Sequence, residues 1–214
     1  MRSAEVLPFR FYLITDRLHT RGQPEQWLPR LAAAGLRAVQ IREKDLTPAA
    51  LYEYASALHR AVTSGASSTP DFYLNDRSDI ALSLGFAGVH LREDSLPLTQ
   101  HAPFLRQHLL FGVSCHSVEG VLAAERAGAA FATFGPVYET DSKTAYGPPV
   151  GLKLLEQAAG KSKLPLLALG GVTPHRVREC LEVGAAGVAA ISAIWDVEEP
   201  LVALEEFRDA LGGL

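Results

Sequence analysis

Reactive residue types follow an apolar run in the segment 134–143. The run 130–134 indicates a buried strand, and Gly135-Pro136 ends it. Two hydroxyls, two acids and one lysine come next, at Glu139, Thr140, Asp141, Ser142 and Lys143. Hydroxyls and backbone N–H groups bond phosphate oxygens, and a lysine adds a compact positive charge. The segment is therefore typical of a loop that faces a phosphorylated ligand, and an ordinary polar loop is the alternative interpretation.

A second group of reactive side chains alternates at the end of another short strand candidate. Gln40, Arg42 and Lys44 occupy every second position, which places all three on one side of an extended segment. Glu43 and Asp45 would point the opposite way, so we exclude them from the predicted site. The pattern predicts a cationic patch suited to an anionic ligand.

Five other strand candidates also end in polar residues or glycines. They end in Asn75-Asp76, Arg92-Glu93-Asp94-Ser95, Ser114-Cys115-His116-Ser117, Gly170-Gly171 and Ser192-Ala193. Each has a purely structural alternative. Asn75-Asp76 could cap a helix, and Gly170-Gly171 could serve a turn, although glycine there also lets a phosphate approach backbone N–H groups. His116 is more often a neighbour of a helix cap than a base, and His90 more often a hydrogen-bonded core histidine.

The strand candidates alternate with stretches of helical periodicity. Leu28 and Leu31 recur at helical spacing, and Gly35 ends that helix in the manner of a C-cap glycine. Thr47-Pro48 is typical of an N-cap followed by proline in the first turn. The pattern predicts eight strands, at 11–15, 38–42, 72–74, 87–91, 109–113, 130–134, 166–169 and 187–191. It also predicts eight helices, at 27–34, 48–63, 78–84, 97–107, 117–127, 150–159, 173–183 and 198–211.

Eight consecutive strand–helix units in about 200 residues match a (β/α)8 TIM barrel near its minimum size. Several strands are apolar on both faces, as parallel strands covered by helices must be. A doubly wound open sheet is the main alternative, but it usually has fewer strands and a glycine-rich first turn, which is absent after Thr15. We therefore predict one α/β domain across 1–214. A central barrel strand has no exposed edge, which favours a buried site over a solvated edge for Gln40, Arg42 and Lys44.

The composition argues against several classes of function. A formal net charge of −4 and the lack of a basic stripe disfavour nucleic-acid binding. The N-terminal residues lack the apolar core of a signal peptide, and no apolar run approaches the length that spans a bilayer. Cys115 and Cys180 form no CxxC motif, so they indicate neither a disulfide framework nor a zinc site. The sequence predicts a cytoplasmic protein without membrane contact, and it leaves open whether the protein forms a homo-oligomer.

The predicted barrel would gather these polar residues at one mouth, because active sites of this fold lie on the loops at the C-terminal strand ends. Phosphate often binds there after strands seven and eight. Cations on the second strand, with acids on the third and fourth, suggest a Mg²⁺–diphosphate substrate. The glycines after the seventh strand suggest a second, monophosphorylated molecule. A reaction that joins two such ligands is a group transfer with diphosphate as the leaving group. Positioning of the two ligands and neutralisation of the charge on the leaving group would lower its barrier.

Several motifs, taken together and in order, resemble those of the thiamine-phosphate synthases and their TenI-type relatives. The similarity runs over nearly the whole chain. Its carriers are Gln40-Ile41-Arg42-Glu43-Lys44, Leu74-Asn75-Asp76-Arg77, Gly88-Val89-His90-Leu91, Gly112-Val113-Ser114-Cys115-His116-Ser117, the loop 135–143 and Ala168-Leu169-Gly170-Gly171-Val172. The resemblance implies a reaction of hydroxymethylpyrimidine diphosphate with thiazole phosphate, giving thiamine phosphate and diphosphate with Mg²⁺. In the synthases diphosphate leaves first, and the thiazole nitrogen captures the resulting pyrimidine cation.

The resemblance also implies roles for the matching residues on the pyrimidine side. Gln40, Arg42, Lys44 and Asn75 would contact the pyrimidine diphosphate, and Ser114 would meet the pyrimidine side of the site. Arg42 and Lys44 are predicted catalytic residues because positive charge there compensates the leaving diphosphate.

Further implied roles concern the phosphates and the metal. Asp76 would bind Mg²⁺. Lys143 joins the predicted catalytic residues as a cation for the leaving group. The phosphates would contact Thr140, Ser142 and Lys143, and the thiazole phosphate would contact Gly171 and Ser192.

The chain departs from the synthase pattern after its fourth strand. The synthases usually carry Gly-Gln-x-Asp there, and that aspartate is the second magnesium ligand. This chain has Arg92-Glu93-Asp94-Ser95, so Ser95 falls on the aspartate position. Asp94 would serve after a one-residue shift of the loop, and we predict Asp76 and Asp94 as the metal ligands.

The loop after the sixth strand departs as well. Glu139 replaces the second proline of the usual synthase motif. The run Glu139-Thr140-Asp141 resembles the TenI-type relatives, which isomerise thiazole carboxylate phosphate. Their tautomerase uses a histidine immediately after the strand-six glycine, where this chain has Pro136. Thiamine-phosphate synthase is the leading hypothesis. The alternatives are a TenI-like tautomerase, with His116 or Glu139 moving the proton, and a non-catalytic regulator that binds thiazole phosphate or thiamine phosphate.

Overall fold

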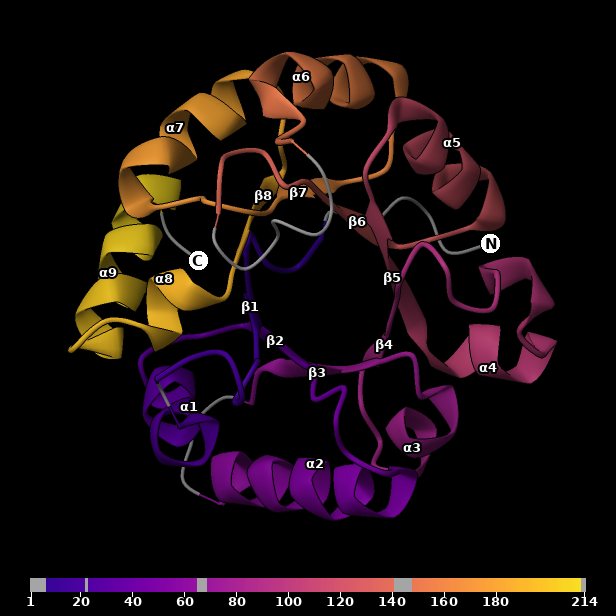
Figure 1. Ribbon diagram of the computed structural model, residues 1–214. Coiled ribbons are helices and arrows are strands. Elements are labelled where there is room, and N and C mark those ends of the chain that lie inside the picture. Colours follow the sequence, from indigo (N-terminus) through magenta and orange to yellow (C-terminus); the bar gives the residue numbers. More distant parts are fainter. Residues whose placement is uncertain (1–6, 22, 65–68, 141–147, 213–214) are drawn as a thin grey trace.

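The computed structural model describes residues 7–21, 23–64, 69–140 and 148–212. In this part of the chain eight parallel strands close into a barrel in sequence order, with β1 paired to both β2 and β8 (Figure 1). The strands are β1 Phe11–Ile14, β2 Ala38–Ile41, β3 Asp71–Asn75, β4 Gly88–Leu91, β5 Leu110–Cys115, β6 Phe131–Phe134, β7 Leu166–Ala168 and β8 Gly187–Ala190. The (β/α)8 prediction is confirmed.

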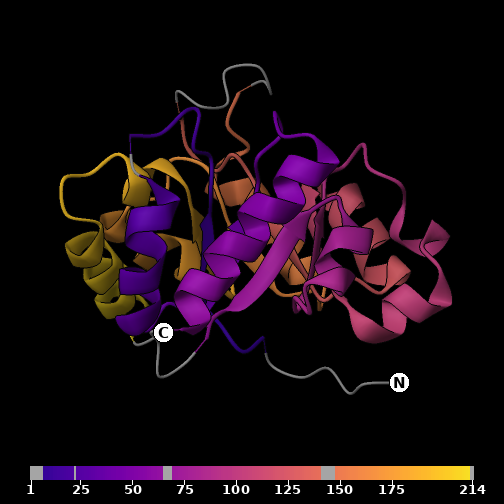
Figure 2. The same ribbon diagram turned by 90° about the horizontal axis from the view of Figure 1, so that it is seen from below.

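Helices surround the strands as an outer ring, which Figure 2 shows from a second direction. They are α1 Pro24–Ala33, α2 Pro48–Thr63, α3 Ser78–Ser83, α4 Pro103–His108, α5 Val118–Ala127, α6 Gly151–Lys161, α7 Pro174–Glu182 and α9 Pro200–Leu211. The predicted N-cap Thr47 accepts a hydrogen bond from the N–H of Ala50 at 3.3 Å, and Ser117 accepts one from Gly120 at 3.0 Å. Such caps satisfy backbone donors that a helix start leaves unpaired.

Two predicted helices differ in the structure. The predicted helix 97–107 is wrong, because a 3-10 turn, Leu98–Gln100, is followed by a separate α4. Pro103 begins α4, and Ala102 before it is extended (ψ 141°), as a residue preceding proline tends to be. The last helix begins at Pro200, and a short extra helix, α8 Ser192–Trp195, precedes it directly after β8.

Side chains alternate along each strand between two apolar cores. On β1, Phe11 and Leu13 pack outward against the helices, whereas Tyr12 and Ile14 belong to the cluster inside the barrel. The same two-residue period holds on the other strands, as pleated backbones require. Once one inward-facing residue of a strand is known, every second residue from it also faces the barrel interior.

An aromatic cluster fills the barrel interior near the N-terminal strand ends. Phe9, Tyr12, Tyr73 and Phe131 are buried, with ring centroids 5.2–5.9 Å apart. Gly112 makes room for this cluster, because a Cβ there would lie 2.5 Å from the Phe131 ring. The rings close this end of the barrel, so inward side chains nearer the C-terminal strand ends form the floor of an open mouth.

Candidate active site

One inward residue from each strand, or from the position directly after it, lines a cavity of about 330 Å³ at the barrel mouth, two positions beyond the core layer. These eight residues are Ile14, Gln40, Asn75, His90, Ser114, Thr133, Leu169 and Ile191. Five of them are polar, and they come from five consecutive strands, β2 to β6. The ring thus offers hydrogen-bonding groups on one side and apolar side chains on the other.

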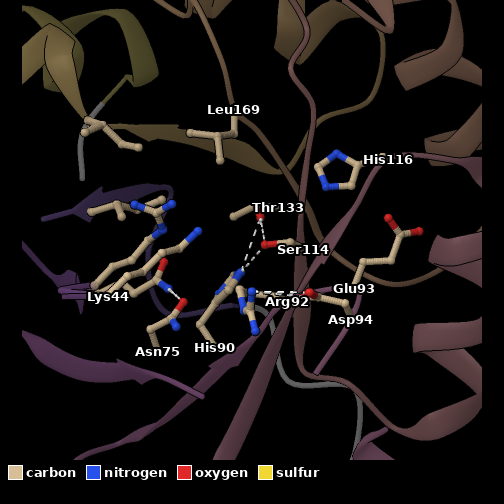
Figure 3. Close-up of a pocket in the computed structure, with 14 residues that line it drawn as sticks. Lys44, Asn75, His90, Arg92, Glu93, Asp94, Ser114, His116, Thr133 and Leu169 are labelled. Atoms are coloured by element: carbon tan, nitrogen blue, oxygen red, sulfur yellow. Dashed lines mark hydrogen bonds and ion pairs between the residues drawn. The ribbon is translucent and has the colours of Figure 1, made fainter. Parts of the chain in front are cut away.

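The predicted cationic patch lies on the wall of this cavity. Arg42 and Lys44 follow β2 and line the cavity together with Gln40 and Asn75. Figure 3 labels Lys44 and Asn75 on this wall. Arg42 Nη1 donates to Asp16 Oδ2 at 3.0 Å. Gln40 Nε2 donates to Asn75 Oδ1 at 3.2 Å. The structure therefore brings these four predicted residues together. A carboxylate partner orients Arg42, and Gln40 and Asn75 orient each other.

A histidine and two hydroxyls from β4, β5 and β6 occupy the next part of the floor. His90 is only 2% exposed, and its Nε2 lies 3.1 Å from Ser114 Oγ and 3.3 Å from Thr133 Oγ1. His90 is thus a hydrogen-bonded buried histidine that also lines the cavity. Ser114 was predicted, whereas Thr133 was not, although it occupies the inward position two residues after Phe131.

His116 lines the same cavity from the segment after β5. Its Nδ1–H donates to the carbonyl oxygen of Gly135, since a carbonyl only accepts. This bond ties the end of β5 to the start of the loop after β6. Cys115 next to it faces the outer core, where burial raises the pKa of the thiol to about 12.

A second cavity, of about 240 Å³, adjoins the first and shares Leu169 and Ile191 with it. Small residues and glycines of the β7 and β8 loops line it, together with the predicted contacts Thr140, Gly171 and Ser192. A Cβ on Gly171 would lie 2.5 Å from the backbone oxygen of Glu139. Its φ of +64° also belongs to the left-handed region, so this close approach of two loops requires glycine.

Hydrogen bonds hold the β6 and β7 loops against each other. The N–H of Tyr138 donates to the carbonyl of Gly170 at 3.0 Å, and Arg176 Nη1 donates to the carbonyl of Gly171 at 2.6 Å. Arg176 also lies over the Tyr138 ring, 4.4 Å from its centroid. Thr140 therefore reaches the second cavity from a loop that β7 and α7 support.

The expected metal ligand Asp76 already has hydrogen-bond donors on both carboxylate oxygens. Oδ2 accepts from Arg92 Nε at 2.7 Å and from Asn75 Nδ2 at 3.0 Å. Oδ1 accepts from the backbone N–H of Arg92 at 3.4 Å and from Ser95 Oγ. Burial alone would raise the pKa of Asp76, but the bonds from Ser95 and Arg92 and the nearby guanidinium charge hold it below its usual value.

These residues do not fit a magnesium site shared by two open carboxylates. Asp94, the second predicted ligand, lines the first cavity, but its side chain is 74% exposed and lies 3.3 Å from Arg92 Nη1. Within the described residues no three His, Cys, Asp or Glu side chains gather in a way that could hold a metal ion. The magnesium prediction stays a prediction.

Two further predicted residues, Ser142 and Lys143, lie outside the described residues. Glu43 and Asp45, which we excluded, line neither cavity. Glu43 is buried behind the cationic wall, where its carboxylate accepts from Thr15 Oγ1 at 2.6 Å and from the N–H of Arg17 at 3.2 Å. Burial raises the pKa of Glu43.

The fold and its two cavities define a class of protein: a (β/α)8 barrel whose mouth has adjoining compartments suited to two anionic ligands. A family model described as "Thiamine monophosphate synthase" matches residues 11–194. The chain belongs to the thiamine monophosphate synthase family.

Individual relatives agree with this family. A protein of Geobacter sulfurreducens, named "Putative thiamine-phosphate synthase", is 45% identical over 187 residues, covering 87% of this chain and 86% of that protein. A thiamine-phosphate synthase of Methanoculleus marisnigri is 35% identical and covers 95% of each chain. The solved structure of thiamine phosphate pyrophosphorylase from Pyrococcus furiosus has a TM-score of 0.82 at 30% identity, with 95% of each chain covered.

Within the described residues no helix is both long enough and apolar enough to cross a membrane.

Proposed function

We propose that this chain is a thiamine-phosphate synthase, which joins hydroxymethylpyrimidine diphosphate to thiazole phosphate. The C–O bond between the pyrimidine methylene and the diphosphate breaks, and the diphosphate leaves with the electron pair. The thiazole nitrogen then donates its lone pair to the methylene carbon, forming the C–N bond of thiamine phosphate. The observation that carries this proposal is the pair of adjoining cavities, one cationic and one lined by glycines, which meet at Leu169 and Ile191.

The first cavity binds the pyrimidine diphosphate. Gln40, Asn75 and Ser114 supply the amide and hydroxyl groups that hydrogen-bond the pyrimidine. Arg42 and Lys44 compensate the charge that grows on the diphosphate as the C–O bond breaks, which lowers the barrier more than it stabilises the bound substrate. Lys143 adds a further cation from the loop after β6.

The second cavity holds the thiazole phosphate. Gly171 lets the phosphate approach the backbone closely, and Ser192 and Thr140 supply hydroxyl donors. The shared border at Leu169 and Ile191 is apolar, so it admits the ring of the acceptor and excludes water from the pyrimidine cation. Holding both ligands across this border makes the capture step effectively intramolecular.

The tautomerase alternative is not favoured. The residue after Gly135 is proline, and His116 is bonded through Nδ1 to the Gly135 carbonyl. The relatives reported above carry synthase or pyrophosphorylase names. We also propose that the protein acts in the cytoplasm, where thiols stay reduced, since Cys115 and Cys180 are both unbridged.

The test incubates the purified protein with both phosphorylated substrates, with MgCl₂ and separately with EDTA. Thiamine phosphate is measured by chromatography, and diphosphate by a coupled pyrophosphatase assay. We expect both products in equal amounts and neither when one substrate is omitted. Failure to release diphosphate under either condition would remove the proposal, and calorimetry showing tight thiazole phosphate binding would then support the non-catalytic regulator.

A further inference from the structure

Arg92 occupies an inward position at the mouth of the barrel. Counting by two along β4 leads from Gly88 to His90 and then to Arg92, and the last two line the first cavity. Arg42 and Lys44 line the same cavity from the segment after β2, and Figure 3 labels Lys44 and Arg92 there. Among the described residues the cavity wall therefore carries a third cation, at the position where the synthase pattern has glycine.

Asp76 fixes the direction of this guanidinium. Its Oδ2 accepts from Arg92 Nε at 2.7 Å, and its Oδ1 accepts from the backbone N–H of the same residue at 3.4 Å. Asp94 lies 3.3 Å from Nη1 on another side. A side chain held at both Nε and Nη1 has lost much of its rotamer freedom before any ligand arrives, so a ligand does not have to order it.

Three side-chain donors, from Arg92, Asn75 and Ser95, already bond the Asp76 carboxylate. The backbone N–H of Arg92, which donates to Ser95 Oγ at 2.9 Å, makes a longer contact of 3.4 Å with Oδ1. Ser95 stands on the position at which the synthase pattern has a second acid, and it donates to Asp76 instead of providing a ligand. A guanidinium next to this carboxylate also repels a divalent cation. Both facts disfavour a metal at this place.

The stability of the fold does not account for the ion pair between Arg92 and Asp76. The Arg92 side chain is 41% exposed, and ion pairs at such exposure stabilise a fold weakly. A guanidinium at a cavity wall is, however, well matched to phosphate, because its planar fork donates two parallel hydrogen bonds.

We infer that Arg92 is the fixed cation that binds the diphosphate of the substrate in place of a magnesium ion, with Asp76 as its positioning residue. The inference rests on the proposed function, because it names the group that compensates the leaving diphosphate. In this chain the family's metal-binding acid has become the support of an arginine. Diphosphate binding then needs no divalent metal.

The first test titrates inorganic diphosphate into the purified protein by calorimetry, in EDTA and in MgCl₂. The wild-type protein binds in EDTA, and Arg92→Gly weakens that binding roughly tenfold or more, the loss typical of a charge-assisted hydrogen bond. Arg92→Lys, which keeps the charge without the planar fork, falls between the two. The matched control is Arg77→Ala, because Arg77 also pairs with an acid two residues further on, Asp79, but lines neither cavity. The control binds as the wild type does.

The second test asks whether the metal site returns. Arg92→Gly combined with Ser95→Asp opens the Asp76 carboxylate and restores a second acid beside it. Electron paramagnetic resonance with Mn²⁺ and diphosphate should then show bound metal in this double variant and none in the wild-type protein. Circular dichroism melts of every variant verify the fold.

Two results would overturn the inference: wild-type binding of diphosphate only with a divalent metal, or an Arg92→Gly variant that binds in EDTA as well as the wild type. These outcomes are separate from the synthase assay. If diphosphate binds through Arg92 without metal but no product forms, the proposed function is rejected and the inference is kept. If synthesis occurs only with a divalent metal, the proposed function is kept and the inference is rejected.

Discussion

The two compartments of the mouth are built in different ways. Side chains of β2 to β6 and of the segments that follow them make most of the first, with an amide pair, two histidines, two hydroxyls, two carboxylates and three cations among the described residues on its wall. Glycines, small residues and backbone of the β7 and β8 loops make much of the second. A ligand in the first compartment is therefore recognised by individual groups, each of which a substitution can remove alone. In the second compartment the ligand is recognised mainly by backbone groups. A substitution that moves the main chain there displaces several of these groups together.

The largest effect is expected in the compartment made of backbone. Gly171→Ala places a Cβ 2.5 Å from the Glu139 oxygen and demands a left-handed conformation of alanine, so the β6 and β7 loops must separate. Strain of this kind costs about 1–3 kcal/mol, and lost phosphate contacts add to it, which predicts a roughly 100-fold rise in KM for thiazole phosphate. Steady-state kinetics with each substrate varied in turn measures it.

Gly85→Ala is the matched control for this substitution. Gly85 has nearly the same φ, +67° against +64°, but a Cβ there meets nothing within 4 Å. It lies before β4 and lines neither cavity, so it should lower stability without changing either KM. If Gly85→Ala raised the KM for thiazole phosphate equally, conformational strain rather than the close loop contact would be the cause.

A smaller and more selective effect is expected for Arg42→Ala. It removes one cation from the first compartment and leaves the β7 and β8 loops untouched. Charged hydrogen bonds contribute about 1.5–3 kcal/mol, so kcat/KM for the pyrimidine diphosphate should fall roughly 10- to 100-fold. The KM for thiazole phosphate, measured at saturating pyrimidine diphosphate, should stay within a factor of about two. An equal loss for both substrates would show that the compartments do not act separately.

Ser192→Ala should have a modest effect, although Ser192 lines the second compartment. If backbone groups hold most of the phosphate there, the loss of one hydroxyl costs about 0.5–1.5 kcal/mol, or roughly three- to tenfold in the KM for thiazole phosphate. A loss as large as that of Gly171→Ala would mean that side chains, not the main chain, bind in this compartment.

The sequence predicted the barrel because its periods are simple: apolar runs at strand spacing, helical repeats, and glycine or proline at their ends. Gln40, Arg42 and Lys44 were found by counting in twos along one strand. The same counting on β4 and β6 leads to His90, Arg92 and Thr133, which were not assigned to the site. These missed residues could therefore have been predicted from the sequence once one inward position on each strand was known.

Other features depend on contacts that no local pattern encodes. The engagement of Asp76 by Arg92 and Ser95 requires the β3 and β4 loops to meet in a particular geometry, with Asp76 at φ +60°. The close packing of Gly171 against Glu139 likewise joins segments about thirty residues apart. Spacing identified the residue types at the mouth, whereas their pairing follows from tertiary packing.

The smallest effect is expected behind the first compartment, at Glu43. This carboxyl bonds Thr15, whose Oγ1 accepts from the N–H of Arg42 at 3.0 Å, so it supports the cationic wall without touching the cavity. Burial raises its pKa in the folded protein above the ordinary value of 4.5. Ionisation of Glu43 is therefore harder in the folded than in the unfolded state. The stability it contributes is complete below pH 4.5 and is lost as the pH rises through the folded-state pKa.

Glu43→Gln removes this titration and keeps the shape of the side chain. At pH 7 the substitution should change the unfolding free energy by about 1 kcal/mol or less, because one lost hydrogen bond is offset by relief of a buried charge. Denaturant unfolding of both proteins between pH 4 and pH 7 measures the difference. The wild-type protein should have its greatest advantage at acidic pH and lose it as the pH rises. A difference that stays constant over this range would show that Glu43 titrates alike in both states and would contradict the prediction.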